Sequence, residues 1–208
     1  VCIEQGEQWL HDFPLFLGIN KKNPPQIAVW LEDTQGNYLS TVYVTHKIAT
    51  QSWQASGGNR RKEALPHWCY SRGIKYDDGL YLSTKKEPLT DGISGATPHG
   101  SFDIKLSPTT ALKKFVVKIE INHSTDFNEA FPQLAKEGET NYSGGKEGSG
   151  QPAIVYTANV DLLSGKKSFE ANLIGHSSPD GSSGEINKDT SGLTTALHIV
   201  KRITVTIQ

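Results

Sequence analysis

The chain has 208 residues, 36% of them hydrophobic, which is enough to form the core of one domain. Its formal net charge of −1 and pI of 6.7 give no basic surface for nucleic acid, and no apolar run reaches the ~18 residues of a membrane-spanning helix. The sequence contains no methionine, so we expect a processed or trimmed chain.

Alternating apolar and polar residues, typical of half-buried strands, begin near residue 26. Two such segments, 27–31 and 38–48, are separated by a polar turn at 32–37, and this arrangement predicts a β-hairpin. The residues expected to share a face are Ile27, Val29 and Leu31 in the first segment and Val42, Val44 and His46 in the second.

The same alternation recurs to the end of the chain, between turns rich in Gly, Ser, Asn and Pro. The segments that show it are 102–106, 115–121, 154–162, 169–173 and 196–207. Because no amphipathic stretch of three helical turns interrupts them, we expect an all-β fold. The sequence predicts an antiparallel, immunoglobulin-like β-sandwich of about seven to ten strands with a long irregular insertion.

Connecting segments have two kinds of pattern. Residues 60–65, followed by Pro66, and residues 124–131, which follow a capping pattern and precede Pro132, are expected to form short helices. The polar segments 142–151 and 177–192 are rich in Gly and Ser. We expect both to be exposed loops, and the first to be a mobile hairpin loop.

We expect a single domain over residues 1–208, with an amino-terminal extension at 1–24 and an inserted loop region at 57–100. The inserted region is long for a connection within a compact domain. It is nevertheless rich in Trp, Tyr, His and Arg, a composition unlike that of disordered segments. We therefore expect it to pack as an ordered appendage, with Trp68 at least half buried.

The heptad D-G-I-S-G-A-T lies near the end of this inserted region, at residues 91–97. A phosphoester needs a hydroxyl group, which Thr97 supplies, while Gly95 and Ala96 leave the backbone open to approach. Ser94 adds a second hydroxyl, and Asp91 begins a turn. The alternative interpretation is a polar turn before a strand, because Gly and Pro punctuate loops in β proteins generally.

The heptad resembles the acceptor signature on which extracytoplasmic flavin transferases esterify FMN to a threonine. Since such an enzyme must reach the hydroxyl, we expect Thr97 to be solvent-accessible and to lie in a turn. Pro98 departs from a simple acceptor because it fixes the backbone directly after the threonine.

Three elements in order resemble a bacterial family of predicted periplasmic proteins, the domain of unknown function 2271. They are W-L-E-D at 30–33, L-P-H-W at 65–68 and S-G-A-T-P at 94–98, and the resemblance covers about residues 25 to 206. Members of this family are similar to secreted β-sandwich proteins, and some are encoded beside membrane redox proteins and flavin transferases. The family's G-x-Y strand and acidic W-D element are altered here to G-S-F-D-I-K at 100–105.

The resemblance implies an extracytoplasmic electron-transfer protein that carries FMN esterified to Thr97, in the periplasm, at the cell surface or secreted from a bacterium. A flavin transferase and membrane redox proteins would be its partners, and Trp68 and His99 would contact the flavin ring. Arg60, Arg61 or Arg72 would offset the phosphate charge. The alternative is a cofactor-free binding or interaction module that uses the aromatic inserted region. Under both interpretations we expect an electron carrier or a binding protein and not a catalyst.

Other chemistry has weaker support in the sequence. His67 and Cys69 could join His46 and His99 as metal ligands, but such spacing is common by chance, so we expect no metal. Cys2 and Cys69 admit two interpretations, a disulfide in an oxidising compartment or two unpaired small hydrophobic residues. No G-x-S-x-G motif indicates a hydrolase.

Overall fold

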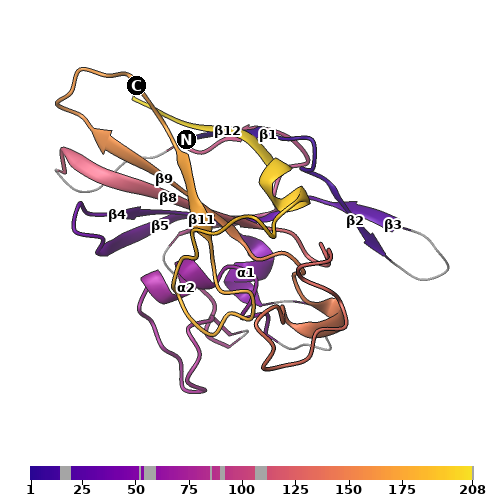
Figure 1. The fold of residues 1–208 in the computed structure, drawn as a ribbon. Coiled ribbons are helices and arrows are strands. Elements are labelled where there is room, and N and C mark those ends of the chain that lie inside the picture. Colours follow the sequence, from indigo (N-terminus) through magenta and orange to yellow (C-terminus); the bar gives the residue numbers. More distant parts are fainter. Residues whose placement is uncertain are drawn as a thin grey trace.

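The computed structural model describes residues 1–14, 20–51, 53, 60–84, 86–89, 92–105 and 112–207. Within these ranges the protein is built from β-strands, with two short α-helices and two 3-10 helices in the connections (Figure 1). The strands form a six-stranded sheet, a four-stranded sheet and a two-stranded hairpin. The predicted all-β, sandwich-like architecture is therefore confirmed.

The larger sheet has the strand order β11-β9-β8-β4-β5-β6. Its strands are β4 (Gln26–Glu32), β5 (Tyr38–Thr45), β6 (Ile93–Gly95), β8 (Lys114–Asn122), β9 (Ile154–Asp161) and β11 (Asn172–His176). All neighbours are antiparallel except β5 and β6, which run parallel. The predicted hairpin of β4 and β5 is present, and β6 is the edge strand next to it.

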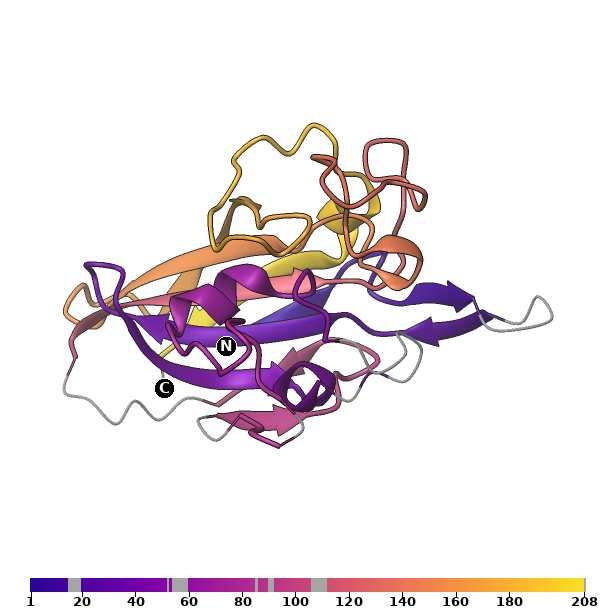
Figure 2. The ribbon, with the colours of Figure 1, turned by 90° about the horizontal axis from the view of Figure 1, so that it is seen from below.

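The smaller sheet has the order β10-β12-β1-β7. Its strands are β10 (Ser168–Glu170), β12 (Val200–Thr206), β1 (Cys2–Gln5) and β7 (Phe102–Asp103). Residues 1–24, expected as an extension, thus supply a central strand of this sheet. They also supply the hairpin of β2 (His11–Pro14) and β3 (Asn20–Asn23), which projects from the body (Figures 1 and 2).

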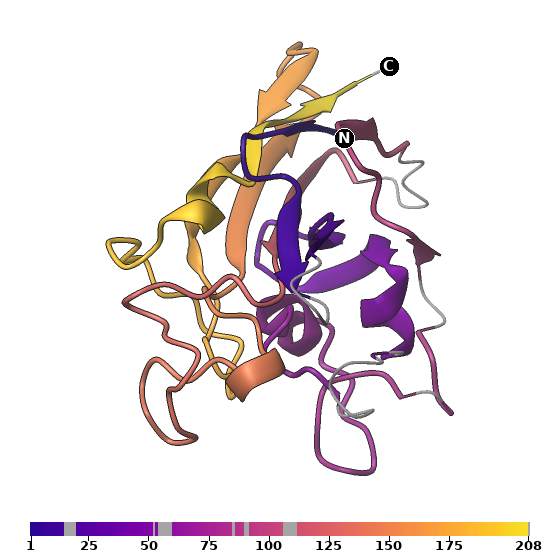
Figure 3. The ribbon, with the colours of Figure 1, turned by 90° about the vertical axis from the view of Figure 1, so that its right-hand side faces the viewer.

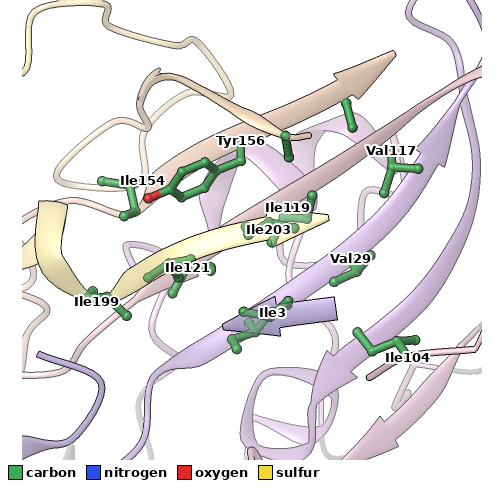
Figure 4. Close-up of a cluster of buried hydrophobic side chains, with 14 of the residues drawn as sticks. Ile3, Val29, Ile104, Val117, Ile119, Ile121, Ile154, Tyr156, Ile199 and Ile203 are labelled. Atoms are coloured by element: carbon green, nitrogen blue, oxygen red, sulfur yellow. The ribbon is translucent and has the colours of Figure 1, made fainter. Parts of the chain in front are cut away.

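An inner cluster of buried hydrophobic side chains lies between the two sheets (Figure 4). Ile3 and Ile203 come from the smaller sheet, and Val29, Ile119 and Ile121 come from the larger one. Each is at most 1% exposed, and burying one such side chain contributes about 1.5–3 kcal/mol before the cost of ordering it. Ile27, Val29 and Leu31 all belong to this cluster, as their alternation predicted.

An outer cluster covers the opposite face of the six-stranded sheet. It joins Trp30 and Val44 of the sheet to the buried residues of α1 (His46–Thr50), of α2 (Pro66–Ser71) and of the segment before α2. Both helices and the 124–151 and 177–192 loops lie together in the lower part of Figure 3. Trp68 is 1% exposed, so its predicted burial is confirmed and the described part of the inserted region packs on the sheet.

A β-bulge in β5 determines which of its side chains face which cluster. Val29 pairs with Tyr43 and Trp30 pairs with Thr41, so Val42 is an extra residue. Tyr43 consequently belongs to the inner cluster, while Val44 belongs to the outer one. The prediction that Val42, Val44 and His46 share one strand face is wrong, because of this bulge and because His46 begins α1.

Both predicted connecting helices are also wrong. Pro66 is the first residue of α2 and does not end a helix, because its fixed φ suits the first helical position, where no N–H is needed. Residues 124–131 contain no helix; there Asp126 forms an isolated bridge with Gly150. The described residues form twelve strands, more than expected, and residues 169–173 are divided between β10 and β11 of different sheets.

The buried guanidinium of Arg61 holds the 142–151 loop in place. It donates hydrogen bonds to Glu63 Oε1 at 2.7 Å, to Ser124 Oγ at 2.6 Å and to Ser149 Oγ at 2.9 Å. Ser149 is fully buried, and the loop contains the 3-10 helix η1 (Gly145–Glu147). The expectation of an exposed loop is wrong here, because Ser149 of the loop is buried and accepts a hydrogen bond from the guanidinium.

The two cysteines are free. Cys2 lies on β1 of the smaller sheet, whereas Cys69 is buried in the outer cluster against the other sheet. The structure therefore supports the interpretation of unpaired residues. No helix among the described residues is long and apolar enough to cross a membrane.

We predict that Arg61→Ala lowers the free energy of unfolding by about 3–5 kcal/mol, because it leaves the buried Glu63 carboxylate without its cation. Urea unfolding followed by tryptophan fluorescence measures the change. Arg202→Ala is the matched control, since it breaks the exposed pair of Arg202 with Glu4 and should have a far smaller effect. Equal losses in the two variants would contradict the role of Arg61.

Candidate functional site

The described part of the heptad forms the free edge of the six-stranded sheet. Ile93, Ser94 and Gly95 of β6 pair in parallel with Tyr43, Val44 and Thr45 of β5. The side of β6 away from β5 pairs with no other described strand. Ser94 and Ala96 are exposed and Ile93 is 67% exposed, so most of the motif is presented to solvent. Asp91 lies outside the described residues.

Thr97, by contrast, turns its hydroxyl inward. The residue is 6% exposed, and its Oγ1 shares a hydrogen bond of 2.8 Å with Oγ1 of Thr45. The Thr45 hydroxyl also accepts a hydrogen bond of 2.9 Å from the backbone N–H of Ile27 on β4. The predictions that Thr97 is accessible and lies in a turn are both wrong, because the residue follows β6 in extended chain and its hydroxyl is buried against Thr45 of β5.

Tyr43 adds a third hydroxyl to this place. Burial raises the pKa of its phenol, while hydrogen bonds with the hydroxyls of Thr97 and Thr45 act in the opposite direction. The phenol also donates to the carbonyl oxygen of Gly95 over a long 3.4 Å. Tyr43, Thr45 and Thr97 therefore form a hydroxyl cluster, which the β5 bulge makes possible by placing Tyr43 and Thr45 on the inner face of the sheet.

The residue after the threonine is tied to the core. The indole N–H of Trp9 donates a hydrogen bond of 3.1 Å to the carbonyl oxygen of Pro98. Trp9 is 2% exposed and belongs to the inner cluster. The backbone around Thr97 is thus held by strand pairing on one side and by the Trp9 indole on the other.

The structure does not bring the other predicted residues together at Thr97. Trp68 belongs to the outer cluster, on the far face of the sheet from the hydroxyl cluster, and its indole donates to Thr41 Oγ1 at 3.0 Å. His99 is exposed two residues beyond Thr97. Arg60 pairs with Asp78 and Arg61 with Glu63, so both guanidinium groups are engaged with carboxylates rather than with a phosphate on Thr97. The proposed contact of Trp68 with a flavin ring on Thr97 is wrong in this arrangement.

A buried carboxylate on the outer face escaped the sequence analysis. Glu120 of β8 is fully buried and accepts hydrogen bonds from the backbone N–H groups of Trp68 at 2.7 Å and His67 at 3.2 Å. Burial raises the pKa of this carboxyl to about 7, against the opposing effect of those donors. Its alternation with Ile119 and Ile121 suggests a solvent-facing residue, and only the aromatic content of the inserted region signals that this face is covered.

A second polar group lies beside it. Lys118 Nζ is 3.1 Å from His67 Nε2 and 3.4 Å from Glu32 Oε2, and the other Glu32 oxygen accepts from the Trp30 indole at 2.8 Å. His67 Nδ1 is 2.7 Å from the carbonyl oxygen of Gly184. Burial lowers the pKa of His67 to about 4, which leaves the ring neutral, with Nδ1 donating and Nε2 accepting.

Metal binding at His67 and Cys69 is not supported by the geometry. Burial raises the pKa of the Cys69 thiol, which disfavours the thiolate that metals bind. Among the described residues, no group of three or more His, Cys, Asp or Glu side chains could hold a metal ion. His67 instead links α2 to the 177–192 loop and to β8.

Comparisons with known proteins leave the family open. No family model matches the chain, and neither a curated protein nor a solved structure matches it. The resemblance to the domain of unknown function 2271 therefore stays a prediction from the sequence.

The Glu120 carboxyl gives the fold a pH dependence of known sign. The folded pKa of about 7 exceeds the ordinary 4.5, so between these values the folded protein retains a proton that the unfolded chain has lost. The free energy of unfolding of the parent, relative to that of Glu120→Gln, should therefore fall by about 3 kcal/mol as the pH rises from 4.5 to 7. Urea unfolding at a series of pH values measures it.

His67 supplies the control of opposite sign. Its folded pKa of about 4 lies below the ordinary 6.5, so its contribution is present above pH 6.5 and is lost as the pH falls toward 4. The free energy of unfolding of the parent, relative to that of His67→Asn, should consequently rise with pH. A Glu120→Gln difference that stays constant over the range would contradict the assigned environment of Glu120.

Proposed function

We propose that the protein is an extracytoplasmic electron carrier that holds FMN esterified to Thr97. The observation that supports this best is the hydroxyl cluster of Tyr43, Thr45 and Thr97 beneath the open edge strand that carries the S-G-A-T sequence. Edge strands with a free side are accessible to another protein. The heptad therefore combines an esterifiable hydroxyl with a surface that a transferase can approach.

The donor set of this edge fits a phosphate group. The hydroxyls of Tyr43 and Thr45 are O–H donors that a phosphate oxygen can accept from, and the exposed Ser94 adds another. The helix α1 contacts β6 and carries the exposed residues His46 and Lys47.

The residues of the chain would position and shield the group in this role. Tyr43 and Thr45 orient the ester oxygen, and the edge strand leaves one side open to a redox partner. A flavin bound in this way supplies electron transfer, which the protein side chains cannot perform alone. A flavin transferase and membrane redox proteins are the partners that the sequence resemblance suggests.

A second candidate is a cofactor-free binding module, which a different observation favours. The rings of Tyr70 and Tyr81 stack with their centroids 4.3 Å apart on the outer side of the protein, where the Tyr70 hydroxyl donates to the carbonyl oxygen of Ser182. Ile74 and Leu80 nearby in sequence are also exposed. Such a surface suits contact with a flat, partly apolar ligand.

Intact mass after export alongside a flavin transferase tests the leading proposal. The parent should gain one FMN-sized adduct and a flavin absorbance band, and Thr97→Ala should gain neither because it has no hydroxyl. Asp91→Ala should reduce labelling, since the heptad is recognised as a unit, whereas Ser101→Ala, just outside it, should not. If the parent gains no adduct while the transferase modifies another substrate, the carrier proposal fails and the binding module stands.

A further inference from the structure

We infer that the folded protein keeps the Thr97 hydroxyl out of reach of a transferase. Thr97 can be modified only while β6 is detached from β5, and Tyr43 and Thr45 are positioning residues that keep β6 paired with β5. This inference rests on the proposed function and concerns the regulation of the same site. It has a structural part, the closure of the edge by the hydroxyl cluster, which is testable without any transferase.

The modification chemistry needs more room than the closed edge provides. The oxygen of Thr97 must bond to the flavin-side phosphorus of a flavin dinucleotide while the bond from that phosphorus to AMP breaks. AMP leaves with the electron pair, and the hydroxyl proton passes to a base of the transferase. With Thr97 6% exposed and its oxygen 2.8 Å from that of Thr45, a pyrophosphate has no approach to the attacking oxygen.

The strand β6 is held weakly by its short pairing with β5, whereas the chain directly after Thr97 is held firmly at Pro98. β6 has three residues and pairs, among the described strands, only with β5. Pro98 is fixed by the Trp9 indole of the inner cluster. Short edge strands open at a smaller free-energy cost than the whole fold. The geometry therefore favours detachment of residues 92–97 with Pro98 as the fixed end.

Gly92 gives this segment its close fit at the other end. Its φ of +135° is a conformation that residues with a side chain rarely adopt, and an added Cβ would lie 2.9 Å from Cγ2 of Thr41. The glycine therefore lets the strand close tightly on β5. An attached phosphate does not fit in the 2.8 Å between the hydroxyl oxygens of Thr97 and Thr45, so the modified chain loses the hydrogen bond between them.

Two pairs of variants test the closure in the full-length chain. Tyr43→Phe removes only the phenol, and its matched control is Tyr156→Phe, a core tyrosine separated from β6 by β8, β4 and β5. Thr45→Val removes the hydroxyl that bonds Thr97, and its matched control is Thr45→Ser, which retains it. Since one hydrogen bond changes an opening equilibrium by about 2- to 10-fold, Tyr43→Phe and Thr45→Val should be labelled faster by that factor.

The rates are measured with purified transferase, FAD and Mg²⁺, and amide hydrogen exchange of Ile93–Gly95 is followed in the absence of transferase. Exchange at these amides should also rise in Tyr43→Phe and Thr45→Val and stay at the parent level in both controls. Equal exchange and equal labelling across all variants would overturn the closure while leaving the carrier proposal intact. Faster exchange in Tyr43→Phe with no labelling of any variant, by a transferase active on another substrate, would uphold the closure and refute the carrier proposal.

Discussion

The buried Glu120 carboxylate is the interaction on which the arrangement of the outer face depends. It lies on the central strand β8 and accepts two backbone N–H groups at the start of α2. These bonds join the inserted region to the sheet, so that Trp30 and Trp68 become buried in the same outer cluster. Farther along the insertion, β6 pairs with β5 at the edge of the same sheet.

The cost of burying this carboxylate is offset in part by donors close to it. An ionised side chain in an apolar environment is unfavourable unless donors surround it, and here the donors belong to the element that covers it. The neighbouring group of Glu32, Lys118 and His67 repeats this arrangement, because each charged or polar atom meets a partner from the sheet or from a covering segment. The outer face is therefore a satisfied polar network with aromatic residues packed around it, and Arg61 fixes the adjoining loop in the same way.

The sequence predicts the part of the fold that depends on local alternation. Strands β4, β8 and β9 follow their pattern because each has one face in the inner cluster, and Trp68 is buried as its size and apolar surface indicate. The bulge at Val42 could not be predicted from the sequence, since one extra residue leaves no local signal. This bulge nevertheless determines that Tyr43 and Thr45 face the inner cluster. Thr97 was expected at the surface because a transferase must reach its hydroxyl. Its burial follows from the parallel pairing of β5 and β6 across a long connection, which no local pattern encodes.

The separation of the two faces also limits which residues a group attached to Thr97 could contact. Trp68 and the buried arginines support the fold on the outer side, whereas the hydroxyl cluster and Trp9 belong to the inner side. A group attached to Thr97 would consequently meet the edge strand and solvent, and not the aromatic residues of the insertion. This places the carrier proposal on the edge of the sheet alone.

Tandem mass spectrometry of the tryptic peptide Glu87–Lys105, from protein isolated from its native cells, tests the central claim most directly. The peptide contains Thr90, Ser94 and Ser101 as well as Thr97, so fragment ions distinguish the four hydroxyl residues. The account predicts an FMN-sized mass on Thr97. A peptide found only in unmodified form, or one that carries the mass on another residue, would contradict it.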